Sequence, residues 1–187
     1  YVKSELHEIG LKTEWFNKRL NATVSVFKIK QENSLEQSAK AGKPDWRVPV
    51  DEESNGFEVD VAGRIAPNWS IVANYAYTDA RIVKLKEEGA LKDLNMQRPS
   101  TPRHAANFWT KYIIQKGALE GLGLGVGVNY VSERLGQVGR RATAATYPEY
   151  TLVNAVLYYK VKDVQFQVNV NNVPNRTYWI SGYDNLR

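Results

Sequence analysis

The sequence predicts an all-β protein, an antiparallel β-sheet segment of a transmembrane barrel with about eight strands. Three observations support this fold class. Apolar residues alternate with polar or small residues through about eight stretches, which is the period of a β-strand. The connections between the stretches alternate between short turns and long polar segments. Tyrosine and tryptophan are abundant, with 11 and 5 residues, and many lie near the predicted strand ends.

Four strands are predicted in the first part of the chain, at residues 7–15, 20–29, 57–65 and 69–78. In each of them apolar residues recur at every second position and polar residues lie between. Each stretch is close to the ~9–11 residues that a tilted strand needs to cross a bilayer. The apolar series are Ile9, Leu11 and Trp15; Leu20, Ala22, Val24 and Val26; Phe57, Val59, Val61 and Ile65; and Trp69, Ile71, Ala73, Tyr75 and Tyr77.

Four more strands are predicted at residues 106–114, 122–130, 153–160 and 164–171. The second of these contains glycines at every second position, from Gly121 to Gly127. A phosphate-binding loop has the spacing G-x-G-x-x-G before a helix, so we interpret these glycines as small residues on a crowded interior face. The apolar series are Ala106, Phe108, Tyr112 and Ile114; Leu122, Leu124, Val126, Val128 and Tyr130; Val153, Ala155, Leu157 and Tyr159; and Val164, Phe166, Val168 and Val170.

The connections alternate in length along the chain. Short turns are expected at residues 16–19, 66–68 and 161–163, with a slightly longer one between Gly117 and Gly121. Transmembrane barrels have short periplasmic turns and long extracellular loops, whereas soluble domains rarely contain several long structureless loops. The pattern therefore places the long segments outside the cell. They are expected at about residues 31–55, 83–103 and 133–148, and from Thr177 onward.

Aromatic residues near the strand ends are predicted to form interfacial girdles, because their rings are apolar and most have a polar tip. The alternative is that aromatic residues are simply good strand formers. The residues concerned are Trp15, Trp69, Tyr75, Tyr77, Tyr112, Tyr130, Tyr150, Tyr158 and Tyr159.

Composition excludes several other classes of protein. No stretch approaches 18 consecutive apolar residues, so a transmembrane helix is not expected. The net charge of +5 is spread along the chain, which argues against nucleic acid as a partner. With no cysteine and only His7 and His104, no metal site is predicted. Glu58 and Asp60 share a strand face with Arg64, and we interpret them as interior charges rather than as a catalytic pair.

Eight segments, in this order and spacing, resemble the C-terminal third of TonB-dependent ferric-siderophore receptors. The resemblance extends over essentially the whole chain. The segments that carry it are His7–Lys12, Asn21–Phe27, Asn55–Val61, Trp69–Ala80, Thr101–His104, Gly121–Gly127, Tyr150–Ala155 and Asn169–Val173.

This resemblance implies that residues 1–187 are the C-terminal part of a plugged outer-membrane barrel of ~22 strands. The plug domain, the early strands and the final strand would lie outside these residues. The first residues contain no initiator Met and no signal peptide, as expected of a mature or excised segment.

The function that the resemblance implies is TonB-dependent import of ferric siderophores across the bacterial outer membrane. The segment would supply barrel wall and extracellular loops and would not act as an enzyme. No protein-bound cofactor is implied, because the siderophore carries the iron. The implied partners are the ferric siderophore, the TonB complex through a region before residue 1, and outer-membrane lipid and lipopolysaccharide. Haem, cobalamin and glycans are left open as alternative ligands.

Candidate ligand residues lie in three of the long segments. Arg134, Arg140, Arg141 and Tyr147 suit an anionic or catecholate ligand through paired hydrogen bonds and stacking, with lipopolysaccharide phosphate as the alternative partner. The resemblance adds Trp179 and Tyr183, because aromatic residues of the last loop often line the pocket in this family. His104, where a long segment re-enters a strand, is a further candidate. The alternative is that His104 is only a polar residue at a strand end.

Two other architectures fit the alternation of residues. One is a complete eight-stranded outer-membrane barrel, whose interior would be filled by side chains. The other is a soluble β-barrel that binds a small ligand inside, and it would need its apolar residues to face inward. Alternation alone does not distinguish the inner face of a barrel from the outer one.

Overall fold

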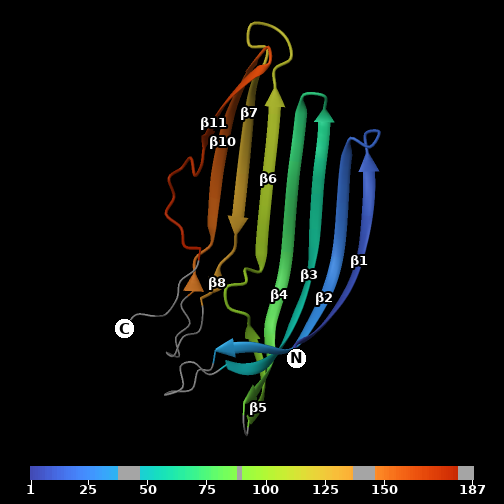
Figure 1. The fold of residues 1–187 in the computed structure, drawn as a ribbon, viewed down its shortest axis with the longest axis vertical. Helices are drawn as coiled ribbons and strands as arrows, with labels where there is room; N and C mark the ends of the chain where they lie inside the picture. The colour runs from blue at the N-terminus through green and yellow to red at the C-terminus, as the bar shows by residue number, and fades with distance from the viewer. Residues whose placement is uncertain (38–46, 88–89, 137–145, 181–187) are drawn as a thin grey trace.

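A computed structural model describes residues 1–37, 47–87, 90–136 and 146–180, which form one curved antiparallel sheet and a small two-stranded one (Figure 1). Each long strand pairs with its neighbours in chain order, as predicted, and β5 pairs with the far end of β4. None of the described residues forms a helix that could cross a membrane. The strands of the large sheet are β1 (Lys3–Trp15), β2 (Leu20–Gln37), β3 (Arg47–Ala66), β4 (Trp69–Glu87), β5 (Ala90–Gln97), β6 (His104–Ile113), β7 (Leu122–Val131), β10 (Tyr150–Val161) and β11 (Val164–Val170). The small sheet pairs β8 (Arg134–Leu135) with β9 (Thr146–Tyr147).

One face of the large sheet is apolar across all its long strands, and we call it the apolar face. Residues directly opposite each other on paired strands point to the same side of a sheet, so the register identifies this face. Many of its large side chains are exposed, Phe108 and Val168 among them. The predicted alternation is confirmed. One row of partners runs through Ala22, Val61, Ala73, Phe108, Val128 and Val153.

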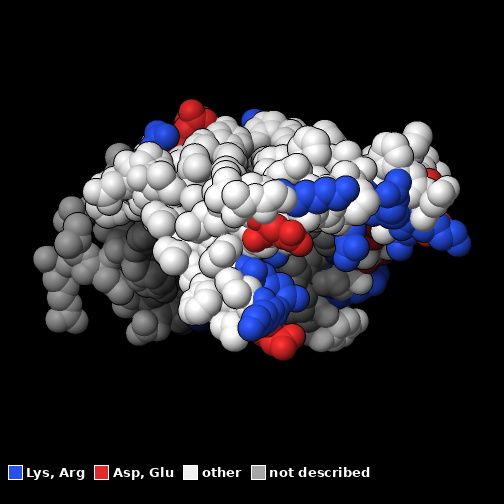
Figure 2. Space-filling model, turned by 90° about the horizontal axis from the view of Figure 1, so that it is seen from above, with Lys and Arg blue, Asp and Glu red and all other residues white. Residues whose placement is uncertain are grey.

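The opposite face, the polar face, carries polar and small side chains, including the predicted interior charges Glu58, Asp60 and Arg64. Amide side chains of successive strands also bond to one another along this face. Nδ2 of Asn154 donates to Oδ1 of Asn129 at 3.0 Å, and Nδ2 of Asn129 donates in turn to Asn107. Seen along the strands from the short-turn end, the sheet is an arc with few charged side chains along its upper side (Figure 2).

The glycines of β7 lie on the polar face beneath large rings. Gly123, Gly125 and Gly127 are buried, and a Cβ atom at Gly127 would lie 2.5 Å from Cε3 of Trp109. At Gly125 a Cβ atom would lie 2.7 Å from Cζ2 of Trp109. The crowding that we predicted for this face is therefore confirmed, and its cause is the indole of the neighbouring strand.

The short connections lie at one end of the sheet, as expected (Figure 1). The predicted long segments are shorter than expected, because β2, β3 and β4 have 18, 20 and 19 residues and extend well into them. Residues 90–97, predicted to be part of a loop, form β5. Strands that leave a membrane need no apolar face, since pairing satisfies the backbone and water solvates the side chains. The polar composition of these residues therefore did not predict their structure.

Most of the predicted girdle residues lie on the apolar face near the strand ends. At the short-turn end, the ring centroids of Trp69 and Tyr112 are 6.5 Å apart and meet edge to face. Tyr150 and Tyr158 are corrections to the prediction. Their partners Val131 and Gly123 place them on the polar face, because each is one residue out of phase with the apolar series of β10.

Candidate functional site

The end of the sheet opposite the short turns, which we call the long-loop end, contains its own apolar cluster. Val48, Val50 and Ile82 are buried together, and Leu85 and Met96 pack against them. These residues come from β3, β4 and β5, so the cluster fixes the three strands where they continue past their apolar stretches.

A polar triad ties β2, β3 and β4 together at the same end. Oδ1 of Asp51 lies 2.6 Å from Nζ of Lys86 and accepts a hydrogen bond from the backbone N–H of Asn33 at 3.1 Å. Burial acts to raise the pKa of Asp51. The hydrogen bonds from Lys86 and Asn33, with the positive charges of Lys86 and Lys84, outweigh burial, and the pKa lies below its ordinary value.

A pocket of about 360 Å³ lies where β6 begins and β7 ends. It is bounded by the connection before β6 and by the β8–β9 pair, so segments far apart in sequence form its walls. Most of its lining side chains are polar or charged. They are Gln97, Arg103, His104, Ser132, Glu133, Arg134, Leu135 and Thr146.

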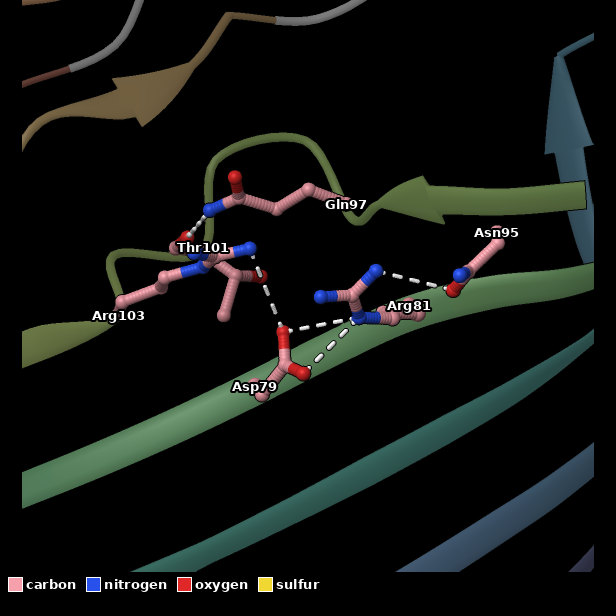
Figure 3. Close-up of polar contacts among 6 residues, drawn as sticks. All are labelled: Asp79, Arg81, Asn95, Gln97, Thr101 and Arg103. Carbon is pink, nitrogen blue, oxygen red and sulfur yellow. Dashed lines mark hydrogen bonds and ion pairs between the residues drawn. The ribbon is translucent and has the colours of Figure 1, made fainter.

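Arg103 enters this pocket from the connection before β6. Its Nη2 lies 3.7 Å from Oδ1 of Asp79 on β4 (Figure 3). The same carboxylate is bound more closely by Arg81, whose Nε lies 2.9 Å from Oδ2. The Asp79 carboxylate therefore pairs mainly with Arg81 and neutralises less of the charge of Arg103. Nε of Arg103 is buried and has no hydrogen-bond partner among the described residues.

Arg134 is the most buried charge in the pocket, with 4% of its surface exposed. Its Nη2 donates to the backbone carbonyls of Trp179 and Ile180 at 2.5 and 2.6 Å. Its guanidinium also lies 5.5 Å from the ring centroid of Tyr147 and 5.6 Å from that of Tyr150. Nη1 is buried without a partner in the described part of the chain. Arg134 thus holds the segment after β11 against the β8–β9 pair.

His104 is the first residue of β6. It therefore lies at a strand end, as the alternative interpretation predicted. Its Nδ1 is 2.8 Å from the hydroxyl of Tyr75, and its ring centroid is 5.2 Å from that of Tyr77. Since Tyr77 and His104 are direct partners, His104 belongs to the aromatic group of the apolar face. It also borders the pocket through its position beside Ser132, whose hydroxyl accepts its backbone N–H.

The structure brings four of the seven predicted ligand residues together around this pocket. Arg134 and His104 line it, Tyr147 packs on Arg134, and Trp179 supplies a carbonyl while its side chain stays exposed. Their contact with a ligand stays a prediction. Arg140, Arg141 and Tyr183 lie outside the described residues.

Sequence reasoning missed Arg103, Gln97 and Ser132 as lining residues. Arg103 carries the only available signal, because it precedes His104 at the point where a polar segment re-enters a strand. Ser132 and Gln97 carry no such signal in the sequence, since they line the pocket only because strand ends that are distant in sequence pack together. In the described ranges no cluster of three or more His, Cys, Asp or Glu residues is placed to hold a metal ion.

Comparisons with known proteins agree with this architecture. Residues 2–173 match the family model described as TonB dependent receptor-like, beta-barrel. The chain is 30% identical over 186 residues to the metal-pseudopaline receptor CntO of Pseudomonas aeruginosa, covering 96% of this chain and 25% of that receptor. It is 30% identical over 178 residues to the catecholate siderophore receptor Fiu of Escherichia coli K12, covering 94% and 22%.

Among solved structures, the siderophore receptor PiuA of Acinetobacter baumannii superposes with a TM-score of 0.77. The identity is 28%, and the match covers 96% of this chain and 25% of that one. The chain thus spans about a quarter of the length of the curated relatives described above.

Proposed function

The chain belongs to the TonB-dependent receptor-like β-barrel family, and on that premise we propose that it is part of the wall of an outer-membrane receptor that imports ferric siderophores. The observation that carries the proposal is the continuous apolar face, opposite a polar face that suits a water-filled or plugged lumen. The named relatives support the choice of cargo, because two of them are siderophore receptors and the third is a metal-pseudopaline receptor.

In the proposed receptor, residues 1–187 are the C-terminal part of the barrel. Further strands, a plug domain and the segment that contacts TonB belong to other parts of the full-length protein. In the part of the chain that the structure describes, the edge strands β1 and β11 do not pair with each other, which favours a larger barrel over a complete eight-stranded one. Figure 2 shows few charged side chains along the upper side of the arc, which suits a wall that faces lipid better than the outside of a soluble barrel.

The chain's role in import is to position groups rather than to make or break bonds. The long-loop end receives the ferric siderophore, and the packed cluster of β3, β4 and β5 supports the strands at that end. The polar face lines the path of the cargo beside the plug. The apolar face contacts lipid, and charged groups beyond its aromatic girdle contact lipopolysaccharide.

The test is uptake of iron by cells that contain or lack the full-length receptor. Cells would be supplied with ⁵⁵Fe as catecholate, hydroxamate or mixed-ligand siderophore complexes under iron limitation. We expect deletion of the receptor to abolish uptake of at least one complex, and loss of TonB to have the same effect. Uptake of every complex at the wild-type rate would contradict the proposal.

A further inference from the structure

We propose that the pocket at the start of β6 binds an oxyanion, held by Arg103 and Arg134 together. The oxygen belongs to a carboxylate, a catecholate or a phosphate, so two sources share this chemistry. One is an anionic ferric complex, in which case the inference rests on the proposed function and defines its substrate class. The other is a phosphate group of outer-leaflet lipopolysaccharide.

The first argument is the unused hydrogen-bonding capacity of the two guanidinium groups. Nη1 of Arg134 and Nε of Arg103 are buried, and neither has a partner among the residues that the structure describes. Burying a donor without an acceptor is unfavourable, and native proteins nearly always satisfy such groups. Both arginines line the same pocket, and the Arg103 side chain is 42% exposed, so an anionic group in the pocket lies in the field of both guanidinium groups.

The second argument is the positive charge of the two arginines that the described contacts do not neutralise. Arg134 is bound by two carbonyl oxygens and two aromatic rings, which satisfy donors without cancelling its charge. Arg103 shares Asp79 with Arg81 and is the more distant of the two (Figure 3). Glu133 is the single carboxylate among the lining residues. A buried cation beside an oxyanion would form the stronger, charge-assisted kind of hydrogen bond.

The third argument is the size and setting of the pocket. A volume of about 360 Å³ accommodates one anionic arm of a larger ligand but not a whole ferric siderophore. Gln97 also lines it, and its amide group has a second N–H besides the one that donates to the carbonyl of Thr101 at 3.3 Å. The pocket is therefore suited to recognise one charged group, while the remainder of the ligand contacts other parts of the receptor.

The experiment compares Arg103→Gln with the wild-type receptor, using the full-length protein purified in detergent. Tryptophan fluorescence would be titrated with the anionic complex ferric tris(2,3-dihydroxybenzoate) and with the neutral complex ferric tris(acetohydroxamate). In parallel, co-purified lipopolysaccharide would be measured as bound phosphorus. Arg64→Gln is the matched control, because it removes the same charge from an exposed position that neither lines the pocket nor shares Asp79. Arg134 is left unchanged, since it also anchors the segment after β11.

If the anion comes from the cargo, Arg103→Gln weakens binding of the anionic complex about tenfold and leaves the neutral complex unaffected. If it comes from lipid, the variant loses bound phosphorus instead. Arg64→Gln changes neither quantity. The inference is overturned if Arg103→Gln alters neither quantity, or if it weakens both complexes equally. Failure of the wild-type receptor to bind either complex would count against the proposed function, and the phosphorus measurement would then decide the inference alone.

Discussion

At the scale of single residues, the guanidinium of Arg134 connects three parts of the long-loop end. It donates to the carbonyls of Trp179 and Ile180 and lies against the rings of Tyr147 and Tyr150. A lysine presents a compact ammonium with no planar fork, so it could not keep the same arrangement of contacts. The position therefore requires an arginine in particular.

Replacing Arg134 with glutamine should release the segment after β11. The two carbonyls would lose charge-assisted hydrogen bonds worth about 1.5–3 kcal/mol in similar settings. Deuterium uptake by residues 172–180 of the full-length receptor should therefore increase. The exposed Arg176 offers a matched control, because its backbone, not its side chain, bonds to Asn172. Equal uptake in Arg134→Gln and Arg176→Gln would contradict the anchoring role.

Asp51 should make the same end of the sheet sensitive to acid. Its pKa is lower in the folded protein than the ordinary value of 3.8, so folding favours the carboxylate. The stabilisation is complete above the ordinary pKa and is lost as the pH falls through the lower, folded value. Deuterium uptake by residues 47–54, corrected for intrinsic exchange, should rise below about pH 4. Asp51→Asn should remove this pH dependence, and a variant that retains it would show that other groups are responsible.

At the scale of elements, β7 is specialised to lie beneath the side chains of its neighbours. Trp109 of β6 covers Gly125 and Gly127, and Nζ of Lys111 lies 3.9 Å from the ring centroid of Tyr158 on β10. Any side chain at these glycines would have to displace an indole that is held between strands. The small residues of β7 are therefore a packing requirement of the polar face.

Gly127→Ala should destabilise the barrel by about 1–3 kcal/mol, the usual cost of overpacking. The temperature at which the folded full-length receptor changes mobility in gel electrophoresis should fall. Gly123→Ala is the matched control, because its nearest contacts, Cγ1 of Ile113 and the backbone oxygen of Tyr112, both lie at 3.2 Å and need a smaller adjustment than the 2.5 Å contact at Gly127. In a Trp109→Ala background the cost of Gly127→Ala should largely disappear. An unchanged cost there would show that Trp109 is not the cause.

The extensions of β2, β3 and β4 are the second specialised feature at this scale. These strands are roughly twice the ~9–11 residues needed to cross a bilayer. The outer parts of β3 and β4 are held by the cluster of Val48, Val50 and Ile82, and the outer part of β2 pairs with β3. The chain thus forms a small apolar core of its own at the long-loop end.

At the scale of the whole molecule, the division into two faces is the property that defines the protein. Adjacent residues on one strand experience opposite environments, as Asn107 and Phe108 show. Asn107 bonds to Asn129 on the polar face, whereas Phe108 pairs with Ala73 and Val128 on the apolar face. This difference can be tested with one substitution at two neighbouring positions.

Phe108→Lys should reduce the stability of the assembled receptor by about 2–4 kcal/mol, the cost of a lysine facing lipid near the middle of a barrel strand. Asn107→Lys should have a much smaller effect, because its side chain points into a polar interior. Folded receptor in outer-membrane fractions would be quantified for both variants. Equal losses would contradict the assignment of the faces, and a greater loss for Asn107→Lys would reverse it.

The sequence by itself determined the strand pattern and the faces of this protein. The alternation from Phe57 to Val61 or from Leu122 to Tyr130 has a period of two, which few structures other than a two-faced sheet can satisfy. The spacing of turns fixed the order of the strands, since short turns join neighbours. The ordered set of motifs also identified the family, which the comparisons confirmed over residues 2–173.

Only the tertiary structure determined the conformation of the strand segments beyond the girdle and the pocket that they form. The outer part of β3 alternates only over Val48, Val50 and Glu52, which is too short and too polar a run for the sequence to predict a strand there. Whether Tyr150 lies inside or outside depends on a register shift of one residue. The pocket of Arg103 and Arg134 depends on contacts between segments about 30 residues apart. A local pattern does not encode such contacts, because they arise from the packing of strand ends against one another.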